Sequence, residues 1–353
     1  MKKVRKTIGL LSVALLAMTL ILAGCGSKSN NSGSAGTESG STNSGSGDSK
    51  AASMKIGMVT DGGGINDKSF NQSAWEGLQQ LNKDTGVEVK PLESKSDADF
   101  EPNLNTFVKD KYDLTWGIGF MMNAALKKVA DENPDAKLGS IDSVVDAPNV
   151  ESVTFAEHEG SFLVGVVAGL MTKTNKIGFV GGMDLPLIKK FEAGFKAGVA
   201  AVNPNATVTA NYVGDFTKPD LGKAAAATIY NAGADIIYHA AGGSGNGVFT
   251  EAKDRLSSGQ KVWVIGVDKD QAIEFGDDIT LTSMVKRVDL AVQIVSKDVI
   301  DGKFEGGKER VLSLKDGGVG LPETNKNIPD DVLAKVNEYK DKIISGEIKV
   351  PTE

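Results

Sequence analysis

The chain contains one cysteine among its 353 residues, at position 25, so no disulfide can form within it. Its only histidines, His158 and His239, are far apart in the sequence, and neither has neighbours at the spacing of a metal site. The sequence also lacks a P-loop and a Gly-x-Ser-x-Gly turn. These absences argue against an enzyme, and we expect neither a metal nor an organic cofactor.

Long apolar runs and clusters of basic residues are equally scarce. One uncharged, mostly apolar run covers residues 8–23, and it is shorter than the roughly 20 residues that a membrane-spanning helix needs. The formal charge of −7 becomes −11 when the four basic residues before that run are left out. An acidic chain without a basic cluster is not expected to bind nucleic acid or anionic lipid, and it favours a neutral or cationic ligand.

The N-terminal segment has the features of an export signal. Basic residues precede the apolar run, which ends in Leu22-Ala23-Gly24-Cys25 and resembles the lipobox of bacterial lipoproteins. The resemblance implies that residues 1–24 are a signal peptide, that cleavage occurs before Cys25, and that Cys25 carries a diacylglycerol thioether. An ordinary export signal with an incidental cysteine is the alternative. Lipidation would also consume the only thiol.

The segment after Cys25 has the composition of a flexible tether. Gly and Ser make up 16 of the 28 residues from Gly26 to Ser53. The segment therefore contains too few apolar residues to form a core. We therefore expect residues 25–53 to hold a folded body at the cell membrane, lipid-anchored on the extracytoplasmic face.

From residue 54 onward, β-rich runs alternate with helical patterns, which is typical of an α/β fold with doubly wound parallel sheets. Three hundred residues exceed one usual core, and the alternation occurs as two similar series, so we expect two lobes with a cleft between them. The predicted strands are Lys55–Val59, Val87–Pro91, Leu114–Gly119, Leu138–Asp142, Lys176–Gly181, Thr207–Val213, Asp235–His239, Val262–Asp268 and Thr280–Val285.

The stretch from Thr60 to Asn71 follows the first predicted strand and leads into a helix predicted to start near Asp67. Ligands in such folds lie at the carboxyl ends of strands, so Asp61, Asn66 and Phe70 are candidate ligand residues. We assign Asp67 mainly to capping the helix.

A second candidate group follows later strands. Gly242 opens a glycine-rich turn that matches a dinucleotide fingerprint only in part, because its third glycine position is Val248. Asp268 ends the next strand, where it could accept hydrogen bonds from ribose hydroxyls or cap the following helix. His239 could line a cleft, but a buried, hydrogen-bonded histidine is the preferred interpretation.

Two phenylalanines could sandwich a flat ring. Phe216 follows the strand Thr207–Val213, and Phe70 lies in the other lobe. Asn123 and Asp142 also follow strands and could contact the polar edges of that ring. Lys286 could donate to a sugar oxygen, hold an aspartate in place, or be a solvated surface lysine.

These residues resemble the basic membrane protein family of lipoproteins, whose best-understood members are purine nucleoside receptors of ABC importers. The resemblance covers essentially all of residues 54–350 and rests on the motifs Val59–Asn71, Glu157–Gly165, Gly178–Phe195 and Val264–Asp268. It implies a type I periplasmic-binding-protein fold with two doubly wound parallel-sheet lobes joined by a three-crossover hinge. The expected lobes are 54–154 plus 285–312 and 155–284 plus 313–353.

The resemblance also implies a role for each candidate residue. Phe70 and Phe216 would stack on the purine. Asp61 and Asp142, with Asn66 and Asn123 nearby, would contact the edge of the base. Asp268, Gly242 and Lys286 would bind the ribose.

The expected function is a solute-binding protein that captures a nucleoside by hinge closure and, as a monomer, delivers it to an ABC permease. One alternative is the same fold with another ligand, such as a pentose, riboflavin or a signalling sugar, although paired phenylalanines favour a flat heterocycle. A nicotinamide-dependent enzyme is a second alternative, which the missing third glycine disfavours. A surface adhesin or antigen is the third.

Overall fold

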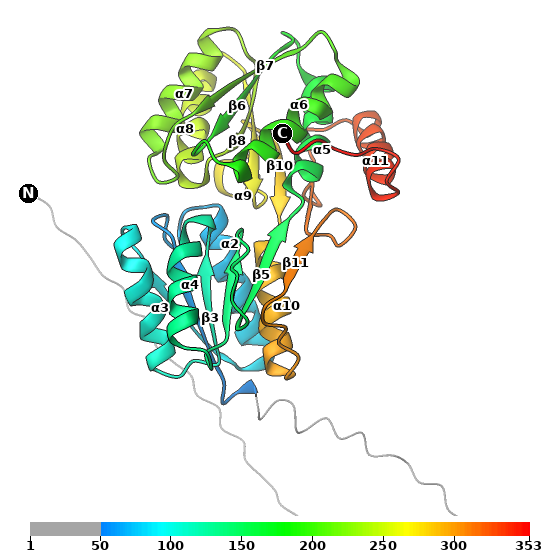
Figure 1. The fold of residues 1–353 in the computed structure, drawn as a ribbon. Coiled ribbons are helices and arrows are strands. Elements are labelled where there is room, and N and C mark those ends of the chain that lie inside the picture. The colour runs from blue at the N-terminus through cyan, green and yellow to red at the C-terminus, as the bar shows by residue number, and fades with distance from the viewer. Residues whose placement is uncertain (1–50) are drawn as a thin grey trace, which may run out of the picture. The chain divides into compact units, whose positions relative to one another are not determined.

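The computed structural model describes residues 51–353, so the predicted signal peptide, the predicted lipidation site Cys25 and most of the predicted tether lie outside the described residues. Two six-stranded sheets form the framework (Figure 1). Sheet A has the strand order β11-β5-β4-β3-β1-β2, and sheet B has the order β12-β10-β9-β8-β6-β7. Every pair of neighbouring strands is parallel except β10 and β12.

The predicted alternation of strands and helices is confirmed, and all nine predicted strands are present within two residues of their expected bounds. The strands are β1 (Lys55–Thr60), β2 (Glu88–Glu93), β3 (Leu114–Ile118), β4 (Leu138–Ile141), β5 (Val150–Phe155), β6 (Lys176–Gly181), β7 (Thr207–Tyr212), β8 (Ile236–Ala240), β9 (Trp263–Asp268), β10 (Thr280–Lys286), β11 (Glu309–Leu312) and β12 (Val319–Gly320).

Helices cover both faces of each sheet. In the first lobe, α3 and α4 pack together, as do α2 and α10; in the second, α5 packs on α6 and α7 on α8. The helices are α2 (Phe70–Thr85), α3 (Phe100–Lys109), α4 (Asn123–Glu132), α5 (Glu157–Met171), α6 (Pro186–Val202), α7 (Pro219–Asn231), α8 (Asn246–Ser257), α9 (Ala272–Phe275), α10 (Val288–Ile300) and α11 (Asp330–Ile344), with short 3-10 turns at Asp97–Asp99, Phe120–Met122 and Gly242–Gly245.

The central strand β1 illustrates why these runs are so apolar. Ile56 and Met58 belong to the core on one face of sheet A, whereas Val59 belongs to a second core cluster with Phe107 on the other face. A parallel strand covered on both faces must be apolar on both, so its sequence shows no hydrophobic alternation.

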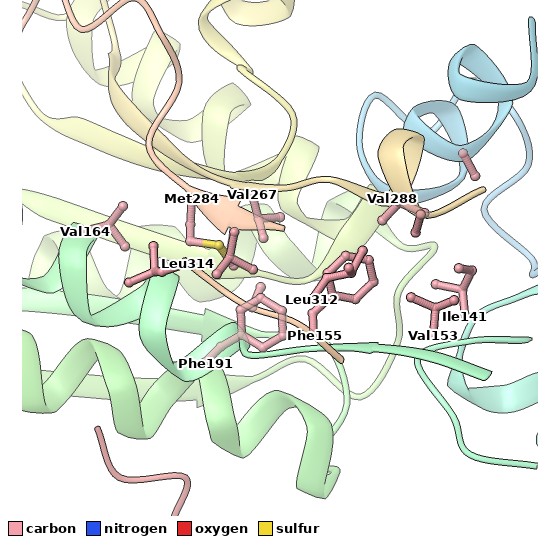
Figure 2. Packing of buried hydrophobic residues seen from close by; sticks show 14 of the residues in the cluster. Ile141, Val153, Phe155, Val164, Phe191, Val267, Met284, Val288, Leu312 and Leu314 are labelled. Atoms are coloured by element: carbon pink, nitrogen blue, oxygen red, sulfur yellow. The ribbon is translucent and has the colours of Figure 1, made fainter. Parts of the chain in front are cut away.

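The chain crosses between the sheets three times, from β5 to α5, from β10 to α10, and from β11 to β12. Apolar side chains fill the crossing region. Figure 2 shows Phe155 and Leu312 between residues of sheet B, such as Met284, and residues of sheet A, such as Val153, and all four belong to one core cluster. The hinge is therefore a packed core continuous with both lobes.

Helices α5 and α6 approach so closely that their contact requires glycine. A Cβ added at Gly198 would overlap the carbonyl oxygen of Phe162, and one at Gly194 would overlap that of His158. These atoms belong to backbone and cannot rotate away, so the two helices would have to separate.

We expect Gly198→Ala to lower the free energy of unfolding by about 1–3 kcal/mol, because an added methyl group overpacks this contact. Urea unfolding followed by circular dichroism measures the loss. Gly320→Ala is the matched control, since no atom lies within 4 Å of a Cβ at that position. Equal midpoints for the two variants would contradict the requirement for glycine at position 198.

Candidate functional site

The loops at the carboxyl ends of the two sheets enclose a cavity with about 640 Å³ of empty space, part of it open to solvent. The lining residues are Asp61, Gly63, Asp67, Phe70, Asn71, Gly119, Phe120, Met121, Asp142, Leu187, Ile188, Phe191, Phe216, Ala240, Gly242, Gly243, Val267, Asp268 and Lys286.

The turn after β1 brings Asp61 into this cavity. One oxygen of Asp61, Oδ1, accepts hydrogen bonds from the backbone N of Gly63 at 2.9 Å and from Asn71 Nδ2 at 2.7 Å. The turn depends on glycine at Gly64, whose φ of 67° is in the left-handed region. Burial raises the pKa of Asp61 to about 6, although its two hydrogen bonds work in the opposite direction.

Asp67 caps helix α2, as predicted, but the helix begins at Phe70, three residues later than expected. Its carboxylate accepts hydrogen bonds from the backbone N of Ser69, Asn71 and Gln72 at 2.9 to 3.0 Å. These N–H groups lie at the start of the helix, where they have no partner within it. The later start leaves residues 67–69 as an irregular segment facing the other lobe.

Apolar side chains from both lobes form the walls of the cavity. Phe70 comes from the start of α2 in the first lobe, and Phe216 from the β7–α7 loop in the second. Phe216 lies against Gly182, where a Cβ would overlap its ring. Phe191 of α6 belongs to the buried core and is 3% exposed, yet it also lines the cavity.

Lys286 lies at the polar centre of the site and is 1% exposed, so the surface interpretation is wrong. Its Nζ lies 2.6 Å from Asp142 Oδ1 and 3.2 Å from Glu157 Oε1. The ring centroids of Phe70, Phe155 and Phe191 lie 4.9 to 5.5 Å from the same ammonium. Because Asp142 follows β4 and Lys286 ends β10, the ion pair joins the two lobes.

Burial disfavours the charged ammonium of Lys286, but the carboxylates of Asp142, Glu157 and Asp268 together raise the pKa of this lysine above its usual value. Burial likewise raises the pKa of the Glu157 carboxyl, against the opposing effect of Lys286. Glu157 was not among the site residues expected from the sequence. An acidic residue at the first position of a helix that is apolar beyond its first turn, one residue after a strand, is the signal that could have found it.

Asp268 is 6% exposed and accepts a hydrogen bond from the hydroxyl of Ser69 in the other lobe. Burial raises the pKa of Asp268 to about 7, with Lys286 opposing the shift. Asp142 and Asp268 both adopt left-handed backbone conformations, with φ of 71° and 66°. Aspartate tolerates that region better than most residues, and such strain is common at functional sites.

The structure brings seven of the nine predicted ligand residues to the cavity and leaves two away from its lining. Asn66 is exposed, and Asn123 donates from Nδ2 to the carbonyl of Val144 at 2.8 Å. The seven that line the cavity are Asp61, Phe70, Asp142, Phe216, Gly242, Asp268 and Lys286.

His239 is fully buried, and its Nε2 lies 2.8 Å from Gln271 Oε1. This agrees with the preferred interpretation of a buried, hydrogen-bonded histidine. Within residues 51–353, no cluster of His, Cys, Asp and Glu side chains could hold a metal ion. No helix in the same range is long and apolar enough to span a membrane.

Comparison with known proteins assigns the family. A family model described as ABC transporter substrate-binding protein PnrA-like matches residues 54–353. The chain belongs to this family. The resemblance to the basic membrane proteins is thereby confirmed, and the chain is the solute-binding protein of an ABC transporter, not an enzyme.

Two curated relatives match nearly the whole chain. A CD4+ T-cell-stimulating antigen from Listeria innocua is 46% identical, over 98% of this chain and 99% of that protein. The ABC transporter nucleoside-binding protein BmpA from Lactococcus lactis is 40% identical, over 99% of this chain and all of that protein.

Solved structures confirm the predicted fold class. An ABC transporter solute-binding protein from Aeropyrum pernix has a TM-score of 0.78 at 31% identity, covering 85% of this chain and 94% of that one. The glucose-galactose binding protein GanP from Geobacillus stearothermophilus has a TM-score of 0.56 at 15% identity, covering 78% and 99%, and shares the fold alone. This solute-binding protein therefore has the type I periplasmic-binding-protein fold.

The raised pKa of Asp268 predicts that the contribution of this carboxyl to the stability of the ligand-free protein falls as the pH rises from about 4 to about 7. In that interval the folded state keeps a proton that the unfolded chain has released, so this contribution to the free energy of unfolding falls by up to about 1.4 kcal/mol per pH unit. Asp268→Asn should flatten this fall in urea unfolding between about pH 5 and about pH 7. Asp135→Asn, an exposed matched control, should retain the wild-type slope. An unchanged slope in Asp268→Asn would show that this carboxyl does not retain its proton.

Proposed function

We propose that this protein captures a nucleoside, specifically a purine nucleoside, with the base between Phe70 and Phe216. The observation that carries the proposal is a cavity with aromatic side chains from opposite lobes and carboxyl groups at its polar end. A flat heterocycle matches the rings, and its attached sugar matches the polar groups. The relative from Lactococcus lactis, which is named as nucleoside-binding, supports the same ligand class.

Asp61 and Asp142 contact the edge of the base. Since the pKa of Asp61 is raised only to about 6, its carboxylate is largely ionised at neutral pH and can only accept hydrogen bonds. Its Oδ1 is already held by Gly63 and Asn71, which fixes the direction of the group. Nucleobases present N–H donors on their polar edges, so an oriented carboxylate favours a base over an apolar ring.

The ribose lies beside Asp268, Gly242 and Lys286. Gly242 has a φ of 51°, which lets the backbone turn close to the ligand without a side chain. Lys286 is the one cation among the described residues that line the cavity, and Asp142 and Glu157 already neutralise it. A ligand with hydroxyl groups and no phosphate therefore matches the charge of the site.

Delivery to an ABC permease follows from hinge closure. A ligand that contacts both lobes stabilises the closed form, and the permease accepts that form. We further propose that the lipid on Cys25 anchors the protein to the cell membrane on its extracytoplasmic face, with residues 26–53 as the tether.

Adenosine, guanosine and inosine should each raise the melting temperature, whereas ribose and NAD should not. A ligand at about 100 times its dissociation constant stabilises a protein by about 2.7 kcal/mol. By calorimetric titration, Phe70→Ala and Phe216→Ala should each weaken nucleoside binding by about tenfold to a hundredfold, because a stacked ring is lost.

Phe304→Ala is the matched control, since Phe304 is a partly buried ring outside the cavity lining. It should bind like the wild type. No thermal shift with any of the three nucleosides would disprove the proposed ligand class, and unchanged affinity in both cavity variants would remove the stacking role.

Lipid anchoring predicts that wild-type protein made in bacteria supplied with labelled palmitate becomes labelled, and that Cys25→Ala does not. The control Ser27→Ala keeps the cysteine and should be labelled like the wild type. Label on the Cys25→Ala protein would place the acyl group elsewhere and refute the assignment.

A further inference from the structure

Three consecutive residues of the first lobe, Asp67, Lys68 and Ser69, are each hydrogen-bonded to a side chain of the second. Asn246 Nδ2 donates to the carbonyl of Asp67 at 3.1 Å, and Gln271 Nε2 donates to that of Lys68 at 2.8 Å. The third bond, from Ser69 to Asp268, belongs to the cavity itself. We propose that Gln271 and Asn246 are positioning residues that form an interlobe latch, which holds the lobes closed over the ligand.

The backbone of Lys68 is shaped for this contact. Its φ of 61° is in the left-handed region, an uncommon conformation for a residue other than glycine. Its N–H donates to Gln72 Oε1 at 3.1 Å within its own lobe, whereas its carbonyl accepts from Gln271 in the other lobe. Strain of this kind persists where surrounding contacts hold it, and here the holding contact comes from the opposite lobe.

The orientation of the Gln271 side chain is fixed by its other partners. Its Oε1 accepts a hydrogen bond from the backbone N of Val267 at 3.0 Å, and His239 Nε2 lies 2.8 Å from the same oxygen. A backbone N–H can only donate, so this atom must be the oxygen and the NH₂ group must face Lys68. The backbone N of Gln271 also donates to Ser283 Oγ at 3.1 Å.

His239 supports this arrangement as a neutral side chain. Burial lowers its pKa to about 4, so at neutral pH the ring carries one proton. Because the nearby Oε1 only accepts, that proton is on Nε2. Nδ1 of this buried ring has no hydrogen-bond partner among the described residues.

One interlobe ion pair outside the cavity is weak because it is exposed to water. Lys269 pairs with Glu76 at 2.7 Å, but Glu76 is 47% exposed, and exposed ion pairs contribute little. Gln271, in contrast, is fully buried. When the lobes separate, the hydrogen bond from the NH₂ group of Gln271 to the carbonyl of Lys68 is broken, which makes opening unfavourable.

Neither Gln271 nor Asn246 lines the cavity, so the latch acts on lobe opening and not on ligand contact. Loss of the latch should therefore accelerate ligand dissociation and leave association nearly unchanged. With a nucleoside as the ligand this expectation rests on the proposed function, whereas the distance between the lobes can be measured without any ligand.

The test variant is Gln271→Glu. Glutamate keeps an oxygen for Val267 and His239 but replaces the NH₂ group with an oxygen that faces the carbonyl of Lys68. In the full chain with Cys25→Ser, nitroxide labels on Lys109→Cys and Lys253→Cys report the distance between the lobes, since both positions are exposed and lie in α3 and α8. We expect longer distances in Gln271→Glu, and inosine dissociation faster by about tenfold in stopped-flow experiments.

The matched control is Gln260→Glu, the same change at an exposed glutamine whose Oε1 accepts only from Arg255 within the second lobe. Asn246→Asp should act in the same direction as Gln271→Glu. If Gln271→Glu and Gln260→Glu give the same ligand-free distance distribution, there is no latch. If inosine fails to bind even the wild type, the nucleoside proposal fails, and the ligand-free distances still decide about the latch.

Discussion

The contact of Lys286 with Asp142 and Glu157 is the interaction on which the site depends. It places one buried ammonium between a carboxylate of the first lobe and a carboxylate at the start of α5 in the second. A buried charge is tolerated only when it is paired and its surroundings are well ordered. Here the crossing strands β5 and β10 supply that order, because their ends lie in the continuous core of the hinge. The chemistry of the cavity and the mechanics of the hinge therefore share the same residues.

An excess of carboxyl groups determines what the cavity can accept. Asp61, Asp67, Asp142 and Asp268 line it, with Lys286 as the one cation among the described lining residues. Burial raises the pKa of Asp61 to about 6 and that of Asp268 to about 7, so at neutral pH Asp61 is largely ionised whereas Asp268 carries only part of its negative charge. Such a site favours donors of hydrogen bonds over anions. Aromatic walls add a preference for a flat ring, and the two preferences coincide in a nucleoside.

The fold and most of the cavity could be predicted from the sequence. Apolar runs at regular spacing indicate the strands, and the carboxyl ends of parallel strands indicate the loops, which suffices for Phe216 and Asp268. Which side chain of a loop faces inward depends on its backbone conformation, so Asn66 and Asn123 were predicted for a cavity that they do not line. Contacts between distant segments, such as Lys286 with Asp142 or Gln271 with Lys68, leave no local pattern in the sequence. An aspartate was only one of several partners that the sequence allowed for Lys286, and no residue pattern indicated the contact of Gln271 with Lys68.

A crystal structure of the protein with a bound purine nucleoside tests the central claim most directly. The account predicts electron density for the base between Phe70 and Phe216, with Asp61 at its polar edge and the ribose hydroxyls beside Asp268. Density for the nucleoside outside this cavity, or a base within it that contacts neither phenylalanine ring, would contradict the account.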